Sequence, residues 1–463
     1  MFKPAVALFA LVAFPAAAQQ LTPAEVAKVD SIVADALAAD QVPSASIAIV
    51  RDGKIVFTKA YGKANDNLPA RTDLPYQIAS NSKQFTAMAL LLLEDEGKLR
   101  LDDHVSKYLP GITGGDRITL RELLAHTSGI QDFWPQDYSF EAMSHPTKPQ
   151  AIIDRWAKKP LDFQPGDQWQ YSNTGYVVAG MIAEKVSGEP LVSFLERRVF
   201  RPLKMTSVRD QDETNGQTFP AGYERYALGP VRKVSPPAHG WLYAAGELSM
   251  SAEDLAKWNI ARINRAVVPA DDWQTQETMV KLNNGKDSGY GLGVFIQKSP
   301  RRAISHGGEA VGFLSENTVY PDQKAAIVVL TNSWSGHPHT RITRDIARLI
   351  LPPATPQSSV ARAQADRARA VYDELRAGRV DRSQLTANAN YYFTPVVIAD
   401  YGSSLGPLGG PTSFEPSGDP ILRGGFVIQG YTIKYPGKTL NLSTFYEPGA
   451  KGRIEQFLVT PGE

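Results

Sequence analysis

The alternation of apolar and polar positions predicts a helix and a strand pair near the start of the chain. Residues 22–25 carry a capping threonine, a proline and an acidic side chain in the order that begins an α-helix. Two apolar, β-branched runs at 47–50 and 55–58 flank Asp52-Gly53, a pair that favours a tight hairpin turn. The chain is therefore expected to open with one helix followed by a β-hairpin.

The middle of the chain changes to helical spacing and then returns to strands. Loops rich in proline and glycine separate four expected helices, at residues 84–96, 120–125, 151–157 and 175–185. Strands of an antiparallel meander are expected at residues 290–297, 303–305, 313–320 and 325–331. Because the N-terminal hairpin can join this meander, the pattern predicts a mixed α/β (α+β) fold with helices inserted between its strands.

A proline-rich segment after residue 350 predicts a second domain. The run Leu351-Pro352-Pro353-Ala354-Thr355-Pro356 cannot continue a helix. We therefore expect a first domain at 19–350, a linker at 351–358 and a small α+β domain of unassigned role at 359–463. The last domain combines a helical stretch at 360–377 with expected short strands between residues 396 and 446. This pattern weakly resembles a cone-shaped NTF2-like unit, with a small β-barrel as the alternative.

The first 18 residues predict a signal peptide. Lys3 precedes an apolar run at 5–14 that is too short to span a membrane, and small residues follow up to Ala18. We expect cleavage after Ala18 and export to the periplasm or the medium, with a buried N-terminal helix as the alternative. No membrane span is expected.

Composition excludes several classes of chemistry. The chain has no cysteine, so disulfides, thiol catalysis and thiolate metal sites are excluded. The 49 basic residues nearly balance the 48 acidic ones, which gives no indication of nucleic-acid binding. His337 and His339 have no evident third ligand, so no metal site is expected. An organic cofactor is not expected either.

Ser80 and Lys83 are the candidate nucleophile and base. They are three positions apart at the start of an apolar helical stretch, so the hydroxyl and the amine face the same side. A catalytic serine needs a base within hydrogen-bond reach. The alternative is a helix cap beside a solvated lysine, since this spacing also arises by chance. Two later motifs, Tyr171-Ser172-Asn173 and His306-Gly307-Gly308, favour the catalytic interpretation.

Together, the three ordered motifs resemble those of the serine β-lactamase and penicillin-binding-protein superfamily. The similarity is closest to its class C-like branch, which contains D-alanyl-D-alanine carboxypeptidases, D-aminopeptidases, class C β-lactamases and related esterases. Residues 123–129 and 245–251 are similar to recurrent non-catalytic segments of that branch. The resemblance covers residues 22–350. It implies an antiparallel sheet flanked by helices, an inserted helical subdomain and a site in the cleft between them.

The resemblance also implies roles for the motif residues. Ser80 attacks a carbonyl and becomes acylated before water releases the product. Lys83 and Tyr171 together remove and return the proton, although both have ordinary pKa values of about 10, so the site must shift one of them. The sequence does not say which one is the base. Asn173 is expected to hold Lys83 through its amide oxygen.

The third motif is expected to complete the oxyanion hole. By the same resemblance, the two donors are the backbone N–H groups of Ser80 and Glu309. Gly307 and Gly308 have no side chain that would obstruct a substrate. Where β-lactamases commonly have lysine, this chain has His306, which is only partly charged near neutral pH. A fixed cationic anchor for a substrate carboxylate is therefore not expected.

The sequence thus predicts an exported serine hydrolase that forms an acyl-Ser80 intermediate. The expected partner is a small-molecule or peptide substrate, and the first choice is a peptide or amide containing D-amino acids. The oligomeric state is not predicted. A carboxylesterase, a weak β-lactamase and a penicillin-binding sensor or scaffold without turnover are the alternatives. His126 is expected to support a loop. Cleft and core positions are equally expected for the aromatic residues Phe133, Trp134, Trp241 and Tyr243.

Overall fold

The structure is a computed structural model that describes residues 20–136, 138–214, 216, 218–227, 229–298, 301–351 and 359–462. The predicted signal peptide and residues 352–358 of the predicted linker lie outside the described residues. The chain divides into two compact units; the first consists of residues 1–298 and 302–352, and the second of residues 299–301 and 353–463. Among the described residues, we find no helix with the length and apolar character needed to cross a bilayer.

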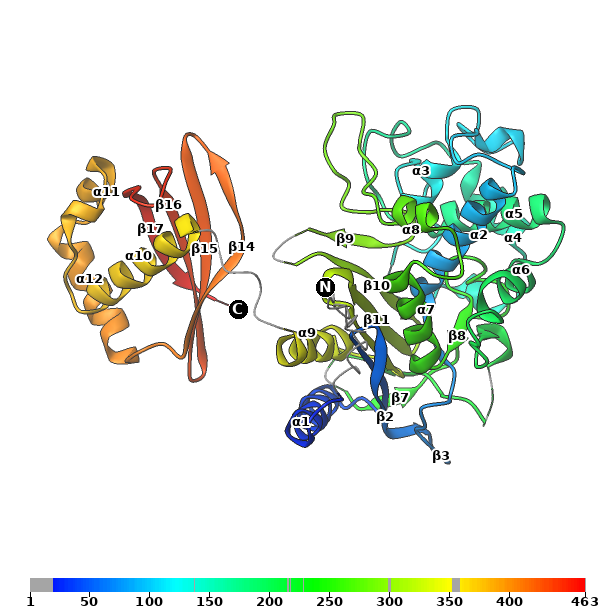
Figure 1. The fold of residues 1–463 in the computed structure, drawn as a ribbon, viewed down its shortest axis with the longest axis horizontal. Coiled ribbons are helices and arrows are strands. Elements are labelled where there is room, and N and C mark those ends of the chain that lie inside the picture. Colours follow the sequence, from blue (N-terminus) through cyan, green and yellow to red (C-terminus); the bar gives the residue numbers. More distant parts are fainter. Residues whose placement is uncertain are drawn as a thin grey trace, which may run out of the picture. The chain divides into compact units, whose positions relative to one another are not determined.

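A seven-stranded antiparallel sheet forms the centre of the first unit (Figure 1). Its strands, in spatial order, are β3 (Leu68–Pro69), β2 (Lys54–Asn65), β1 (Ser44–Arg51), β12 (Ala325–Thr331), β11 (Phe313–Tyr320), β10 (Ala303–Ala310) and β9 (Phe295–Gln297). The N-terminal hairpin joins the later meander through β1 and β12, where Ala48 is paired with Val328. The predicted mixed fold with an antiparallel sheet is therefore confirmed.

Both faces of this sheet are covered by helices. Side chains of a strand alternate between the two faces. Ile47 and Ile49 of β1 pack in one apolar cluster with side chains of α1 (Pro23–Asp40) and α9 (Pro338–Ile350). Ala48 and Val50 belong to the cluster on the other face, which includes α7 (Ala252–Asn264). In Figure 1, α9 and α7 lie on opposite sides of the sheet.

The helical part of the first unit lies between β3 and β9 in the chain. Besides α7, its α-helices are α2 (Lys83–Asp95), α3 (Leu120–Leu124), α4 (Pro149–Ile152), α5 (Asn173–Ser187), α6 (Leu191–Leu195) and α8 (Ala270–Gln276). Two small sheets complete the unit: β4 (Tyr76–Gln77), β8 (Leu248–Met250) and β5 (Arg209–Asp210), and β13 (Ser333–Trp334), β6 (Tyr223–Arg225) and β7 (Val231–Lys233). The helix α2 is buried from Lys83 to Leu93 and forms the centre of the larger apolar cluster.

The strand expected at residues 290–297 is shorter than predicted. Only β9 forms, because the chain bends before it at two glycines. A Cβ on Gly291 would lie 2.2 Å from the carbonyl oxygen of Gln276, and Gly293 has a left-handed φ of 79°. The strand expected at 303–305 instead continues to Ala310, so it carries the whole third motif.

In its described residues, the second unit has three α-helices and a four-stranded antiparallel meander. The helices are α10 (Ser359–Arg376), α11 (Ala387–Tyr392) and α12 (Pro395–Leu405), and the strands follow the order β14 (Ser413–Arg423), β15 (Phe426–Tyr435), β16 (Lys438–Tyr446) and β17 (Ile454–Pro461). Among the described residues, β14 and β17 are the opposite edges of this sheet, so the small-barrel alternative is wrong.

The strands expected between residues 396 and 446 are present from Ser413 onward, but the expectation is wrong for residues 395–405, which are helical. Thr394 caps this helix by accepting the Val397 N–H at 3.3 Å, and Pro395 occupies the first helical position. The cap and the proline thus overcome the strand preference of the β-branched residues that follow.

Candidate active site

A sharp turn places Ser80 beside the main sheet. The chain leaves β4 and enters a 3₁₀ turn, Ala79–Ser82, from which α2 begins at Lys83. Ala79 has a left-handed φ of 48°, a conformation that costs a non-glycine residue about 1 kcal/mol. Contacts with β8 hold the turn, since the Ile78 N–H donates to the Leu248 carbonyl at 3.0 Å and the Leu248 N–H donates to Ser82 Oγ at 3.1 Å.

Lys83 is completely buried and uses three hydrogen bonds. Its Nζ donates to Ser80 Oγ at 3.0 Å, to Asn173 Oδ1 at 2.8 Å and to the Ala245 carbonyl oxygen at 2.7 Å. Its exposed fraction is 0%. Burial disfavours the charged form and lowers the pKa of Lys83 to about 7, against an opposing effect of the nearby Asp132 carboxylate. Near neutral pH a large fraction of Lys83 is therefore a free amine that can accept the Ser80 proton.

Tyr171 lies against the same lysine. Lys83 Nζ is 4.8 Å from the centre of the Tyr171 ring. Burial raises the pKa of Tyr171 well above its ordinary value, and the carboxylates of Asp132 and Glu309 add to this increase, whereas its hydrogen bond with Ser80 opposes it. A tyrosinate is thus disfavoured here, and Tyr171 is better suited to donate a proton than to act as the base.

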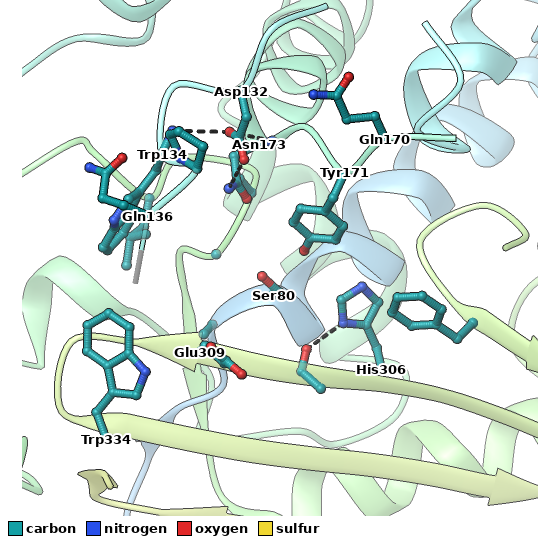
Figure 2. A pocket seen from close by; sticks show the side chains of 17 residues that line it. Ser80, Asp132, Trp134, Gln136, Gln170, Tyr171, Asn173, His306, Glu309 and Trp334 are labelled. Carbon is teal, nitrogen blue, oxygen red and sulfur yellow. Dashed lines mark hydrogen bonds between the residues drawn. The ribbon is translucent and has the colours of Figure 1, made fainter. Parts of the chain in front are cut away.

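Asp132 fixes the orientation of the Asn173 amide. Its carboxylate accepts the Asn173 backbone N–H at 3.0 Å, the Asn173 Nδ2 at 3.2 Å and the Trp134 backbone N–H at 3.2 Å. With Nδ2 donating to Asp132, the amide oxygen of Asn173 is directed at Lys83, as Figure 2 shows for the Asp132–Asn173 pair. Sequence reasoning missed Asp132, although it lies just after the recurrent stretch at residues 123–129.

The same stretch contributes His126, which supports the Tyr171 segment. His126 has a φ of 60°, and its Nδ1 accepts the Ser172 N–H at 3.1 Å. Its ring centre is 4.2 Å from that of Tyr171. Burial lowers the pKa of His126 well below its ordinary value, so the ring is neutral. The second recurrent stretch, residues 245–251, also reaches the site, because its first carbonyl binds Lys83.

His306 is held as a neutral imidazole. Its Nδ1 donates to the carbonyl oxygen of Gly307, so its Nε2 accepts from the Tyr290 hydroxyl at 2.8 Å. Burial and the charge of Lys83 lower the pKa of His306 to about 3. The side chain is only 3% exposed. In this arrangement, His306 provides no positive charge for a substrate carboxylate.

Gly308 allows the serine turn to approach the sheet. A Cβ on Gly308 would lie 2.1 Å from the Ile78 carbonyl oxygen and 2.3 Å from Ser315 Oγ. At Gly307 the nearest atom to such a Cβ is 3.5 Å away, which is an ordinary contact. Beyond Ser305, β10 has no pairing with β9 in the described structure, so this edge of β10 is next to the serine turn. Glu309 follows on the same strand and is exposed.

These groups line one cleft of about 480 Å³. Its walls are formed by Ala79, Ser80, Asp132, Trp134, Pro135, Gln136, Gln170, Tyr171, Asn173, Leu242, Ala245, Gly246, Phe295, His306, Gly307, Glu309 and Trp334. Figure 2 shows Ser80 at the centre of this cleft, with Tyr171 and His306 directed toward it. Of the four aromatic candidates, Trp134 lines the cleft, whereas Phe133 and Trp241 are core residues and Tyr243 packs against the core. The described residues contain no cluster suited to a metal ion.

Comparisons with known proteins agree with this geometry. The Beta-lactamase family model matches residues 29–351. The chain therefore belongs to this family of serine hydrolases. Penicillin-binding protein 4* of Bacillus subtilis (strain 168) is 29% identical over 301 residues, which are 60% of this chain and 66% of that protein. The chain thus aligns with slightly less than two thirds of the length of this relative.

Two solved structures illustrate the likeness of the fold. A D-stereospecific amidohydrolase from Streptomyces sp. is 30% identical, with a TM-score of 0.58, covering 67% of this chain and 96% of that one. An octameric penicillin-binding protein homologue from Pyrococcus abyssi is 21% identical, with a TM-score of 0.63, covering 94% of this chain and 99% of that one. The second match extends over most of this chain, beyond the family domain.

The close approach at Gly308 predicts different effects of alanine at the two glycines. Gly308→Ala forces the serine turn away from β10 and is expected to lower the free energy of unfolding by about 1–3 kcal/mol. Gly307→Ala is the control and is expected to change it by less than about 0.5 kcal/mol. Urea unfolding followed by circular dichroism measures both, and equal stability of the two variants would contradict the packing described for Gly308.

The charge of Asp132 predicts the direction of a pH shift. Asp132 raises the pKa of Lys83, so Asp132→Asn should lower it further. If neutral Lys83 is the base, kcat/KM rises with pH through about 7 in the wild type, and this acid limb moves to lower pH in the variant. The profile is measured with a neutral ester. An acid limb that stays in place or moves to higher pH would show that Asp132 does not act on the base.

Proposed function

We propose that the protein hydrolyses amides and peptides of D-amino acids through an acyl-Ser80 intermediate. The observation that carries this proposal is the 3.0 Å contact between Ser80 Oγ and a buried Lys83 whose pKa is lowered to about 7. A serine hydroxyl paired with a base that is partly neutral near pH 7 is an activated nucleophile. Family membership supports the same chemistry.

The steps follow from the positions of these groups. Neutral Lys83 takes the Ser80 proton while Oγ bonds to the substrate carbonyl carbon. The negative charge that develops on the carbonyl oxygen is stabilised by the backbone N–H groups of Ser80 and Glu309. As the C–N bond breaks, the leaving amine receives a proton from the Lys83–Tyr171 pair. Water then attacks the acyl-enzyme, gives its proton to the same pair and restores Ser80.

The substrate class is supported by one relative above all. The Streptomyces amidohydrolase with 30% identity is described as D-stereospecific, and the cleft is bordered by aromatic and small side chains that suit a compact acyl group. An ester needs the same nucleophile, base and oxyanion donors. Esterase activity is therefore the closest alternative, and strong β-lactamase activity is not favoured because His306 carries no charge.

Export is the second part of the proposal. The charged start, the short apolar run and the small residues before Gln19 support a cleaved signal peptide. Expression of the full chain in a bacterial host should yield a mature protein that begins at Gln19 and appears in the periplasm or medium, as determined by N-terminal sequencing of cell fractions. An uncleaved protein confined to the cytoplasm would refute this part.

A substrate panel tests the catalytic proposal. Purified protein is mixed with D-alanine p-nitroanilide, a D-alanyl-D-alanine peptide, p-nitrophenyl acetate and a chromogenic cephalosporin. We expect multiple turnovers with the D-amino acid amide and a fall of at least about 10³-fold in Ser80→Ala. Mass spectrometry of the quenched reaction should show the acyl group on Ser80.

Other outcomes select among the alternatives. Preference for the ester over both D-amino acid substrates would favour an esterase. A single adduct without turnover would favour a penicillin-binding sensor. Turnover that survives in Ser80→Ala would contradict the proposed nucleophile.

A further inference from the structure

The glutamine that follows Lys83 is buried and joins the serine turn, Ala79–Ser82, to α7. Gln84 is the second residue of α2 and is only 1% exposed. Its Nε2 donates to the carbonyl oxygen of Asn81 at 3.1 Å. Its Oε1 accepts from Trp258 Nε1 at 2.6 Å and from Arg262 Nη2 at 3.1 Å. One side-chain amide thus connects the turn that carries Ser80 to a helix on the same face of the sheet.

The two donors of α7 fix the orientation of this amide. The indole N–H of Trp258 and the guanidinium of Arg262 can only donate, so the group that faces them is the amide oxygen. The amide nitrogen is therefore directed at Asn81, where the backbone carbonyl oxygen and, at 3.4 Å, the side-chain Oδ1 accept. Rotation of the amide by half a turn would place its N–H groups against the donors of α7. Gln84 consequently presents its donor to the serine turn in one orientation.

A buried charge cluster holds Arg262 in place. Its centre is Glu277, whose side chain is 1% exposed. The Glu277 carboxylate pairs with Arg262 at 3.1 Å, with Arg265 at 2.7 Å and with Arg302 at 2.8 Å. Because three guanidiniums share one carboxylate, positive charge is in excess among these four side chains. Arg302 directly precedes β10, so the cluster is also linked to the strand that carries His306.

The backbone of Gln84 is enclosed as well. Gln276 of α8 donates from Nε2 to the Gln84 carbonyl oxygen at 2.8 Å, and its Oε1 accepts from Arg262 Nη2 at 2.8 Å. The bend before β9 also approaches closely, because a Cβ on Gly293 would lie 2.7 Å from the Lys83 carbonyl oxygen and 2.8 Å from Gln84 Cα. Packing this close resists a shift of the start of α2.

The serine turn is held by Gln84 and by the main sheet. Asn81 Nδ2 donates to Ser315 Oγ at 2.9 Å, and Ser315 Oγ donates to the Ile78 carbonyl oxygen at 2.9 Å. These bonds attach the turn to β11. The Asn81 carbonyl, which Gln84 binds, belongs to the residue directly after Ser80. Loss of the Gln84 donor is therefore expected to displace Ser80.

We propose that Gln84 is a positioning residue of the active site, whose side-chain donor fixes the serine turn so that Ser80 Oγ stays in reach of both Lys83 and the substrate carbonyl. The charge cluster around Glu277 acts through Gln84, because Arg262 orients the amide. Gln84 does not line the cleft, so it acts on the geometry of acylation and not on contacts with the substrate. The inference rests on the proposed function, which requires Ser80 to be acylated. Misplacing a reacting group by about 1 Å can cost about 10²-fold in rate.

Two substitutions remove this donor and differ in their effect on stability. Gln84→Glu keeps an oxygen for Trp258 and Arg262, and the excess positive charge favours its ionised form, so Tm should stay within about 3 °C of the wild type. Gln84→Met removes the acceptor as well and should lower Tm by more than about 3 °C. In both variants, the rate of Ser80 acylation by p-nitrophenyl acetate should fall by at least about 10-fold. The burst of p-nitrophenol, recorded well below Tm, measures this rate.

Gln276→Glu is the matched control, because it adds the same carboxylate beside Arg262 and leaves the bond between Gln84 and Asn81 in place. Its acylation rate should stay close to that of the wild type. A wild-type rate in either Gln84 variant would overturn the proposal. Rates that follow Tm across the three variants, or an equal loss of rate in Gln276→Glu, would overturn it too, since both results indicate a general effect on the cluster.

Two substrates separate this inference from the proposed function. Acylation by p-nitrophenyl acetate reports on Ser80 whether the protein is an amidase, an esterase or a sensor without turnover. If this ester acylates Ser80 while D-alanine p-nitroanilide is not turned over, the proposed amidase function fails, and the three variants still decide the role of Gln84. If the ester does not acylate Ser80 in the wild type, both proposals fail.

Discussion

The desolvation of Lys83 is the interaction on which the whole site depends. Lowering its pKa from 10.5 to about 7 corresponds to about 5 kcal/mol between the two protonation states. The fold supplies this energy by burying α2 along nearly its full length against α5, α6 and α8. Three hydrogen-bond acceptors and the nearby Asp132 carboxylate limit the free-energy cost of burying the charged form of Lys83. The amine can therefore be either charged or neutral near pH 7. A serine three positions earlier thereby obtains a base that works near neutral pH.

Strained backbone conformations around this lysine show how the sequence positions the site. Ala79, His126 and Ala244 all have left-handed φ values, of 48°, 60° and 54°. Each precedes or supports a group of the site: Ala79 precedes Ser80, His126 holds the Tyr171 segment, and Ala244 precedes the carbonyl that binds Lys83. Such conformations cost about 1 kcal/mol each, so they persist because the surrounding packing fixes them. The site therefore depends on several loops that come from distant parts of the chain.

The sequence alone predicts much of the fold because its signals are local. The Thr22 cap, the hairpin at Asp52-Gly53 and the strand-rich region after residue 303 all follow from residue patterns over a few positions. Where local signals compete, prediction fails: the apolar residues after Thr394 favour a strand, yet the cap and Pro395 start a helix. The strand prediction for residues 395–405 fails for this reason.

The sequence predicts the motif residues of the candidate site, but it does not predict their protonation states. Ser80, Lys83, Tyr171 and His306 are found by spacing and order. The structure places Ser80, Tyr171 and His306 in the wall of one cleft, and the buried Lys83 donates a hydrogen bond to Ser80. Asp132 could not be assigned from the sequence, because its contact with Asn173 joins positions 41 residues apart. The neutral state of His306 likewise depends on its burial and on the charge of Lys83, which is distant in the chain. The functional roles of these residues are still predictions, and their electrostatic state is accessible to direct measurement.

That measurement is the titration of Lys83 itself. Carbon-13 labelling of lysine, with Lys83→Met to assign the signal, allows the Cε chemical shift of Lys83 to be followed against pH by NMR. The account predicts a transition near pH 7, about three units below that of an ordinary lysine. A Lys83 signal that titrates only near pH 10 would contradict the claim that burial makes this amine the base for Ser80.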